Sequence, residues 1–341
     1  MANEIPGINL LVEVGGTAVV AQSNATLSTS TELAEAIVKS TNFTKQNSGD
    51  QDWTLSYEGQ FTESDGDHAL TDGKASLKVG DPTGITAVDD TSDVFTTSED
   101  KSTDWTSGDT VYVIQSSGNN GEYSIASISG TDVTVNETIS DSTADGRIFN
   151  PDVVPGVQSL SLNLEQELND VPPGINETVG WTNYVPLRRT FSVEADGHYY
   201  DPTDEATYET IHTARDNGDN LGGVVTVMGV DFFGEIAADS MDIEAGTDDN
   251  ASYSLSWAGS GEIDRNGTAE TTIDSLVSLY FDQSTATASL RHVEDGTDVT
   301  GSTYWSGTTY LSTLEVALER GEYPELSTEL QGDGQLTRNT V

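Results

Sequence analysis

The chain has 341 residues, with 58 aspartates and glutamates against 13 lysines and arginines, so its formal net charge is −45 at pH 7. It contains no cysteine, which excludes disulfides and thiolate chemistry, and it has no apolar run of about 18 residues that would predict a transmembrane helix. The acidic residues are scattered, which favours a folded protein with an acidic surface suited to molar salt over a disordered acidic tail, a specific basic partner or a calcium buffer. The length allows two or three domains, and the start of the chain lacks the basic and long apolar segments of a secretory signal.

The first 60 residues predict two hairpins. Residues 8–14 form a strand, Gly15 and Gly16 a turn, and residues 17–22 the returning strand. Residues 22–33 alternate weakly, and residues 34–51 predict a long polar loop. The stretch DWTLSYEG then places Trp53, Leu55 and Tyr57 on one face of another strand.

Residues 76–150 predict a small inserted β module. Strands are expected at residues 110–115, 121–129 and 132–136, separated by the turn sequences SSGNN and SGTD. The alternative is a long hairpin extension of the surrounding sheet.

Residues 155–200 repeat the pattern of residues 22–59. Two alternating strands flank a loop that contains proline and glycine. In the first strand, Leu27 and Leu33 match Leu162 and Leu168 at one constant offset. In the second strand, at a slightly longer offset, Trp53, Leu55, Tyr57 and Gly59 match Phe191, Val193, Ala195 and Gly197. The sequence therefore predicts two copies of a strand–long loop–strand unit.

A second repeat relates residues 240–263 to residues 313–336 at a constant offset, without a gap. Each is an alternating strand, an acidic turn and another alternating strand that ends in Gly-x-Gly and an apolar residue. A short helix is predicted before each hairpin, at residues 203–216 with Thr203 or Asp204 as N-cap, and at residues 271–282.

This ordered set of elements resembles the major tail tube proteins of long-tailed, siphovirus-like viruses, with residues 52–59 and 240–263 carrying the resemblance best. The resemblance implies an all-β fold of two tail-tube-type β-sandwiches, each with one short helix, and a small inserted β module. The expected domains are an outer sandwich (residues 1–75 plus 270–341), an outward-facing module (76–150), which is similar to small β modules of phage structural proteins, and an inner sandwich (151–269). A strand-exchanged pairing of the halves would give the same sequence order.

The same resemblance implies a virion structural protein, the major tail tube subunit, and the acidic surface points to a virus of a haloarchaeon. Family rings contain six sandwiches, so two per chain predict a homotrimer in pseudo-hexameric rings that stack into a helical tube. The expected partners are further copies, the tape measure protein and other tail proteins, without a membrane. DNA would pass an acidic lumen without specific binding, because a negative wall repels phosphates. The expected location is the virion tail, assembled in the host cytoplasm. Alternatives are a baseplate or distal tail ring protein, or a secreted β-sandwich surface protein.

The two long loops contain four of the few basic residues, Lys39, Lys45, Arg188 and Arg189. In the family this loop reaches the neighbouring subunit and the next ring, which implies that these side chains meet acidic surfaces across subunit interfaces. The alternative is that they form local salt bridges.

No motif of catalysis or cofactor binding is present. The four histidines, His68, His198, His212 and His292, have no metal-binding spacing, and packing or surface roles are expected for them. Asp65 with Asp67, and Asp248 with Asp249 and Asn250, could hold a magnesium or calcium ion, but neither has the spacing of an EF-hand. The sequence therefore predicts no enzyme and no cofactor, with a bound magnesium or calcium ion as a minor alternative.

Overall fold

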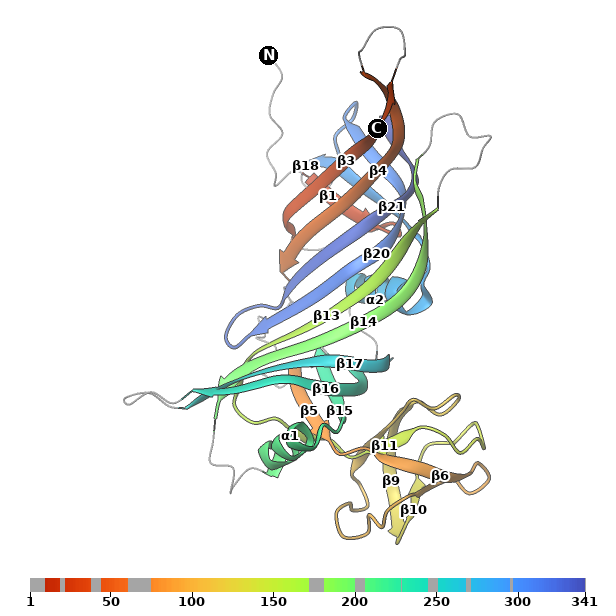
Figure 1. Ribbon diagram of the computed structural model, residues 1–341, viewed down its shortest axis with the longest axis vertical. Coiled ribbons are helices and arrows are strands. Elements are labelled where there is room, and N and C mark those ends of the chain that lie inside the picture. The colour runs from red at the N-terminus through yellow and green to blue at the C-terminus, as the bar shows by residue number, and fades with distance from the viewer. Residues whose placement is uncertain are drawn as a thin grey trace.

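The computed structural model describes residues 10–18, 22–37, 44–60, 75–171, 181–199, 206–227, 229–244, 251–267, 271–294 and 297–340. The fold is nearly all β, as predicted, and two short α-helices occur among the described residues. A tall sheet of long, tilted strands occupies most of the molecule, and a small barrel lies at one end of it (Figure 1).

Fifteen strands belong to one continuous sheet. In chain order they are β1 (Leu10–Val14), β2 (Thr17–Ala18), β3 (Gln22–Ile37), β4 (Thr44–Gln60), β5 (Ala75–Gly80), β12 (Asp152–Val153), β13 (Val157–Val171), β14 (Asn183–His198), β15 (Leu221–Val227), β16 (Val230–Glu244), β17 (Ser252–Asn266), β18 (Ala286–Glu294), β19 (Thr297–Asp298), β20 (Thr303–Glu319) and β21 (Glu325–Thr340). The helices α1 (Ala206–Asn217) and α2 (Thr271–Asp282) precede β15 and β18.

Eight long antiparallel strands form the middle of this sheet, in the order β3-β4-β21-β20-β13-β14-β17-β16. The hairpin β3–β4 therefore pairs with the last hairpin of the chain, β20–β21, and the hairpin β13–β14 pairs with β16–β17. This pairing is nested. The hairpins β3–β4 and β20–β21 are neighbours in the sheet, although β13, β14, β16 and β17 lie between them in the sequence. Figure 1 shows the strands side by side along the molecule.

The eight strands divide into two groups of four with the same register. The first unit is β3-β4-β21-β20 and the second unit is β13-β14-β17-β16. Leu27 lies opposite Leu55 as Leu162 lies opposite Val193, and β-bulges interrupt β3 and β13 at equivalent places. The repeat of residues 240–263 in residues 313–336 likewise carries the pairing of β16 with β17 onto that of β20 with β21. The two units meet where β20 pairs with β13.

Strand alternation builds one large core. In the parts of the long strands that cover the core, alternate residues are buried, including Leu55, Leu162, Val193, Leu255 and Leu314, and the helices add apolar side chains to the same cluster. The residues between them point to the opposite face of the sheet. Burial of one face fixes the register, because a slip of one residue would turn the whole apolar set outward.

The Gly-x-Gly motifs are explained by an aromatic residue that lies over the sheet in each unit. A Cβ atom at Gly332 would come within 2.2 Å of the Trp53 ring, and one at Gly259 within 2.2 Å of the equivalent Phe191 ring. The second glycine of each motif has a left-handed backbone, with φ of 78° at Gly334 and 95° at Gly261. Trp53 also donates a hydrogen bond from Nε1 to the Gly334 carbonyl at 3.0 Å. The first glycine thus makes room for a ring and the second permits the bend.

The inserted module is a closed barrel rather than a hairpin extension. Its strands are β6 (Thr83–Asp89), β7 (Val94–Thr97), β8 (Thr110–Ile114), β9 (Gly121–Ser129), β10 (Asp132–Val135) and β11 (Arg147–Phe149). The predicted boundary at residue 76 differs from the structure, because β5 pairs with β15 in the large sheet. The strands β5 and β12 on either side of the barrel pair as β1 and β2 do on either side of the Gly15–Gly16 turn. Val79 of β5 lies opposite Asp152 of β12, and Val14 of β1 lies opposite Thr17 of β2. The barrel is therefore inserted at the position of that turn.

Most of the described residues in the two predicted long loops, residues 34–51 and 169–189, belong to strands. In the hairpin β3–β4 the pairing continues to Ile37 opposite Thr44, and in the hairpin β13–β14 it continues to Val171 opposite Asn183. The prediction of loops was wrong here. The two polar segments of each hairpin pair with each other beyond the edge of the core, so they lack the apolar alternation that marks a half-buried strand. Helix α2 has the predicted bounds, and α1 begins at Ala206, with the predicted N-cap residues outside the described part of the chain.

Candidate assembly surface

One face of the eight-stranded run is polar and acidic. We call it the open face, and it consists of the outward residues Asn24, Thr26 and Ser28 of β3; Thr54, Ser56 and Glu58 of β4; Ser159, Ser161, Asn163 and Glu165 of β13; Ser192, Glu194 and Asp196 of β14; Ser240, Asp242 and Glu244 of β16; Ser252, Ser254 and Ser256 of β17; Glu315, Ala317 and Glu319 of β20; and Glu325, Ser327 and Glu329 of β21. These positions hold mainly carboxylates, hydroxyls and amides, and none is a lysine or an arginine.

The carboxylates of the open face are interleaved with hydroxyls. Glu194 lies between Ser161 and Ser256, and Asp196 between Ser159 and Ser254. The Ser159 hydroxyl donates to Asp196 at 3.1 Å, and Ser254 donates to the same carboxylate. In the strand pairs that the structure describes, no acidic residue lies directly opposite another. This arrangement avoids the like-charge pairs that destabilise a sheet, so a high charge density is compatible with long strands.

The two outer strands of the run have unpaired edges. Among the described residues, β3 pairs with β4 alone, and residues 240–244 of β16 pair with β17 alone. These edges lie at opposite ends of the eight strands (Figure 1). An unpaired strand edge offers backbone donors and acceptors to another chain. The open face and the two edges together form the candidate assembly surface.

The four predicted basic residues do not lie together in the described part of the chain. Lys39 is outside it, and Lys45 lies in β4, whose backbone alone is described there. Arg188 forms an exposed salt bridge with Glu167 at 3.2 Å. Arg189 donates hydrogen bonds to the backbone carbonyls of Tyr280 at 3.3 Å and Phe281 at 2.8 Å. Arg189 therefore caps the C-terminus of α2, where a cation is favoured.

The barrel docks on the face of β15 and β16 that points away from the main core. Val225 and Phe232 belong to the main core, whereas Val224 and Phe233 pack with Phe149 of the barrel. The contact depends on polar groups as well as on this apolar cluster. These are the hydrogen bond from Tyr112 to Asp231 at 2.6 Å, that from Gln115 to Glu235 at 2.6 Å, that from Asn120 to Asp264 at 2.8 Å, and the ion pair of Arg147 with Glu235.

Burial at this contact changes two ionisation equilibria. Burial raises the pKa of Asp264, and the charge of Glu262 raises it further, while Arg189 and the hydrogen bond from Asn120 lower it. Burial and the hydrogen bond to Asp231 raise the pKa of the Tyr112 phenol. Both groups take part in hydrogen bonds between the barrel and the strands β16 and β17.

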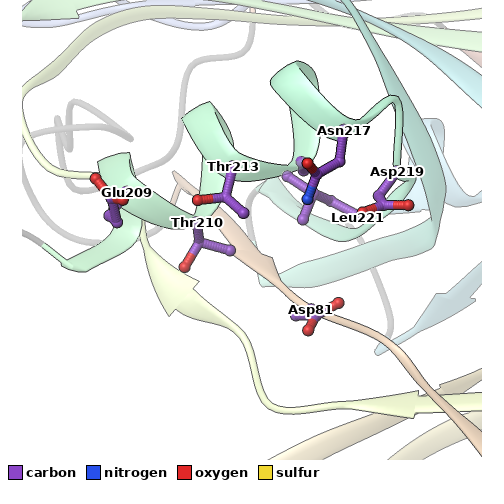
Figure 2. A pocket seen from close by; sticks show the side chains of 8 residues that line it. Asp81, Glu209, Thr210, Thr213, Asn217, Asp219 and Leu221 are labelled. Carbon is purple, nitrogen blue, oxygen red and sulfur yellow. The ribbon is translucent and has the colours of Figure 1, made fainter.

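A hollow of about 300 Å³ lies beside α1, between that helix and the segment that follows β5 (Figure 2). Its lining includes Asp81, Glu209 and Asp219, together with the hydroxyls of Thr210 and Thr213. The residues that line it include no histidine, lysine or arginine. The charged side chains of this lining are therefore all carboxylates, without a basic side chain beside them among the lining residues.

The remaining candidates for chemistry are dispersed. His198 is exposed at the end of β14, and the Nε2 atom of His212 lies 3.5 Å from the Tyr199 hydroxyl. His68 and both predicted cation-binding segments lie outside the described residues. No cluster of metal-binding side chains occurs within the described ranges, and no described helix is long and apolar enough to span a membrane.

Sequence reasoning missed the two strand edges, because alternation alone does not reveal which strand lacks a neighbour. The available signal was the second repeat, which makes residues 240–244 equivalent to residues 313–317. Residues 313–317 pair with β13, whereas residues 240–244 have no equivalent partner among the described residues.

The comparisons with known proteins give weak matches. No protein-family model and no curated protein matches the chain. A solved structure of the tail of an empty gene transfer agent particle, with C6 symmetry, matches 35% of this chain and 87% of its own at 19% identity and a TM-score of 0.32. The virion of a native gene transfer agent particle matches 34% of this chain and 89% of its own at 19% identity and a TM-score of 0.31.

Proposed function

We propose that this chain is a virion structural protein, the major tail tube subunit of a long-tailed virus. The observation that carries the proposal is the run of eight long strands, in which two units with the same register form one continuous sheet with an acidic open face and two unpaired edges. Closure of such sheets into a barrel removes the edges, and the open face then lines the lumen. The two units are, on this proposal, two copies of one tail-tube sandwich.

The number of chains follows from the sixfold rings of the family that the sequence resembles. Two units per chain require three chains for one pseudo-hexameric ring, and rings stacked by heterologous contacts form a tube. Three chains with eight long strands each, at a spacing of about 4.8 Å and a tilt of about 40°, give a backbone diameter of about 48 Å. Inward-pointing side chains narrow this diameter, and the remaining lumen is still wide enough for a nucleic-acid duplex.

The charge of the open face suits a conduit for DNA. Phosphates are attracted to lysine and arginine through the release of counterions, and the open face has neither in its described positions. DNA would pass along it without specific binding. On this proposal the tape measure protein and other tail proteins are the further partners, and the chain assembles in the cytoplasm of a haloarchaeal host.

Electron microscopy of the full chain in about molar KCl, with light scattering for mass, tests the proposal. Rings of three chains that stack into tubes are the expected result. Single rings that never stack would favour a distal tail ring protein instead. A monomer at every concentration would refute the proposal.

A further inference from the structure

Strand β20 has two different neighbours along one of its edges. Its first half, residues 305–309, pairs with β18, and its second half, residues 313–319, pairs with β13. The equivalent strand β16 repeats the first arrangement, because residues 230–236 pair with β15. The second arrangement is missing within the chain, since residues 240–244 have no partner on that edge among the described residues.

The missing partner is identified by the repeat. The neighbour of β20 is β13, and the strand equivalent to β13 is β3, which has the other unpaired edge. We propose that residues 240–244 of β16 pair antiparallel with residues 26–30 of β3 in a second copy of this chain. The internal pairs Leu314–Leu164 and Val316–Leu162 carry over to Met241 opposite Thr29 and Ile243 opposite Leu27. This inference rests on the proposed function and gives the contact that closes the ring.

The exposure of apolar side chains supports this pairing. Val316 is 3% exposed where β13 covers it, whereas the equivalent Ile243 is 41% exposed. On the other edge Leu162 is 1% exposed, and the equivalent Leu27 is only partly buried. Each unpaired edge thus presents an apolar side chain that its internal counterpart buries against a neighbouring strand.

The charges favour pairing between the two different edges over pairing of like edges. Residues 240–244, SMDIE, contain two carboxylates, and residues 22–31 of β3, QSNATLSTST, contain none. Two copies of β16 would bring Asp242 and Glu244 close to the same carboxylates of the partner, which is unfavourable. In the proposed register Asp242 lies opposite Ser28 and Glu244 opposite Thr26. A contact between unlike edges is heterologous and therefore produces a ring or filament rather than a closed dimer.

Disulfide trapping tests the register, because the chain has no cysteine of its own. Directly opposed residues in antiparallel strands have Cα atoms about 4.5–5.5 Å apart, which suits a disulfide. The test variant is Ser28→Cys with Asp242→Cys, oxidised as the full chain in about molar KCl. The matched control is Asn163→Cys with Glu315→Cys, the equivalent pair inside one chain. The register control is Ser28→Cys with Ser240→Cys.

The expected result is a ladder of covalent multimers that ends at the closed ring for the test variant. The matched control should lose both thiols and remain a single chain on a denaturing gel, and the register control should cross-link at least tenfold more slowly. Rings or tubes that form without cross-links, while the matched control oxidises, would overturn this pairing and leave the proposed function standing. The absence of both multimers and rings would refute both. Efficient dimers of Ser28→Cys alone or Asp242→Cys alone would show pairing of like edges and also overturn it.

Discussion

The contact of Trp53 with Gly332 predicts a large penalty for the smallest possible substitution. In Gly332→Ala the new Cβ atom would lie 2.2 Å from Cε2 of Trp53, with two further ring atoms within 2.4 Å. Trp53 is 2% exposed, and its indole donates a hydrogen bond to the Gly334 carbonyl, so the ring cannot turn away without losing that hydrogen bond. Overpacking of this kind costs about 1–3 kcal/mol, and contact with a rigid ring places this case near about 3 kcal/mol. Chemical denaturation in about molar KCl measures the loss.

The control is Gly84→Ala, because a Cβ atom there would meet only the Ser98 hydroxyl at the ordinary distance of 3.7 Å. We expect that variant to change the free energy of unfolding by less than about 0.5 kcal/mol. Trp53→Leu should cost less in the Gly332→Ala background than in the wild type, since the two changes share one contact. Equal losses for Gly332→Ala and Gly84→Ala, or additive losses in the double variant, would refute the account of the Gly-x-Gly motif.

Three further predictions concern the seam, which is the proposed pairing of residues 240–244 of one chain with β3 of the next, the cap of α2 and the barrel contact. Ile243→Ser should weaken each seam by about 1 kcal/mol, or roughly fivefold in affinity, because the pairing would cover the exposed part of a side chain that is 41% exposed in the single chain. Light scattering as a function of protein concentration measures this affinity. An equal effect of Val153→Ser, a control at an exposed valine, would contradict the prediction. Arg189→Gln should lower the free energy of unfolding by about 1–2 kcal/mol, because the hydrogen bonds that cap α2 are lost. Arg188→Gln removes only an exposed salt bridge and should cost less than about 0.5 kcal/mol. Urea denaturation measures both changes, and equal losses would contradict the capping role of Arg189. Asp264→Asn should stabilise the fold at pH 7, because a carboxyl whose folded pKa is raised opposes folding when ionised. That gain should shrink as the pH falls through the folded pKa towards the unfolded value, and a gain independent of pH in urea titrations would contradict it.

The alternating strands of the core could be predicted from sequence, because burial of one face leaves a period of two. Strand β9 has the predicted bounds, and the pairs Leu27–Leu55 and Leu162–Val193 lie where the repeat places them. Helix α2 was equally clear, since its apolar residues recur at helical spacing between polar segments.

The hairpin arms and the edge of the inserted module could not be predicted in the same way. Beyond Leu33 and Leu168, the two strands of each hairpin pair with each other outside the core, so apolar alternation does not mark these arms as strand. Strand β5 is short and lies far in sequence from β15, and only tertiary pairing assigns it to the large sheet. The barrel interrupts that strand's hairpin at a turn, where an insertion disturbs little backbone pairing.

The charge pattern links the stability of the single chain to its assembly. On the open face, the sheet avoids opposing its carboxylates by placing each of them opposite a hydroxyl or an amide, as Glu315 lies opposite Asn163 within the chain. The unpaired edges continue the same rule, because the acidic edge of β16 needs a neutral partner and the hydroxyl-rich edge of β3 supplies one. Salt should therefore act on both levels in the same direction, by screening the diagonal repulsions that remain in the folded chain and across each seam. Dilution of KCl should first dissolve tubes and then unfold the subunit, since a seam has fewer buried apolar contacts than the core. Unfolding of the subunits before the tubes dissolve would contradict a common origin for the two effects.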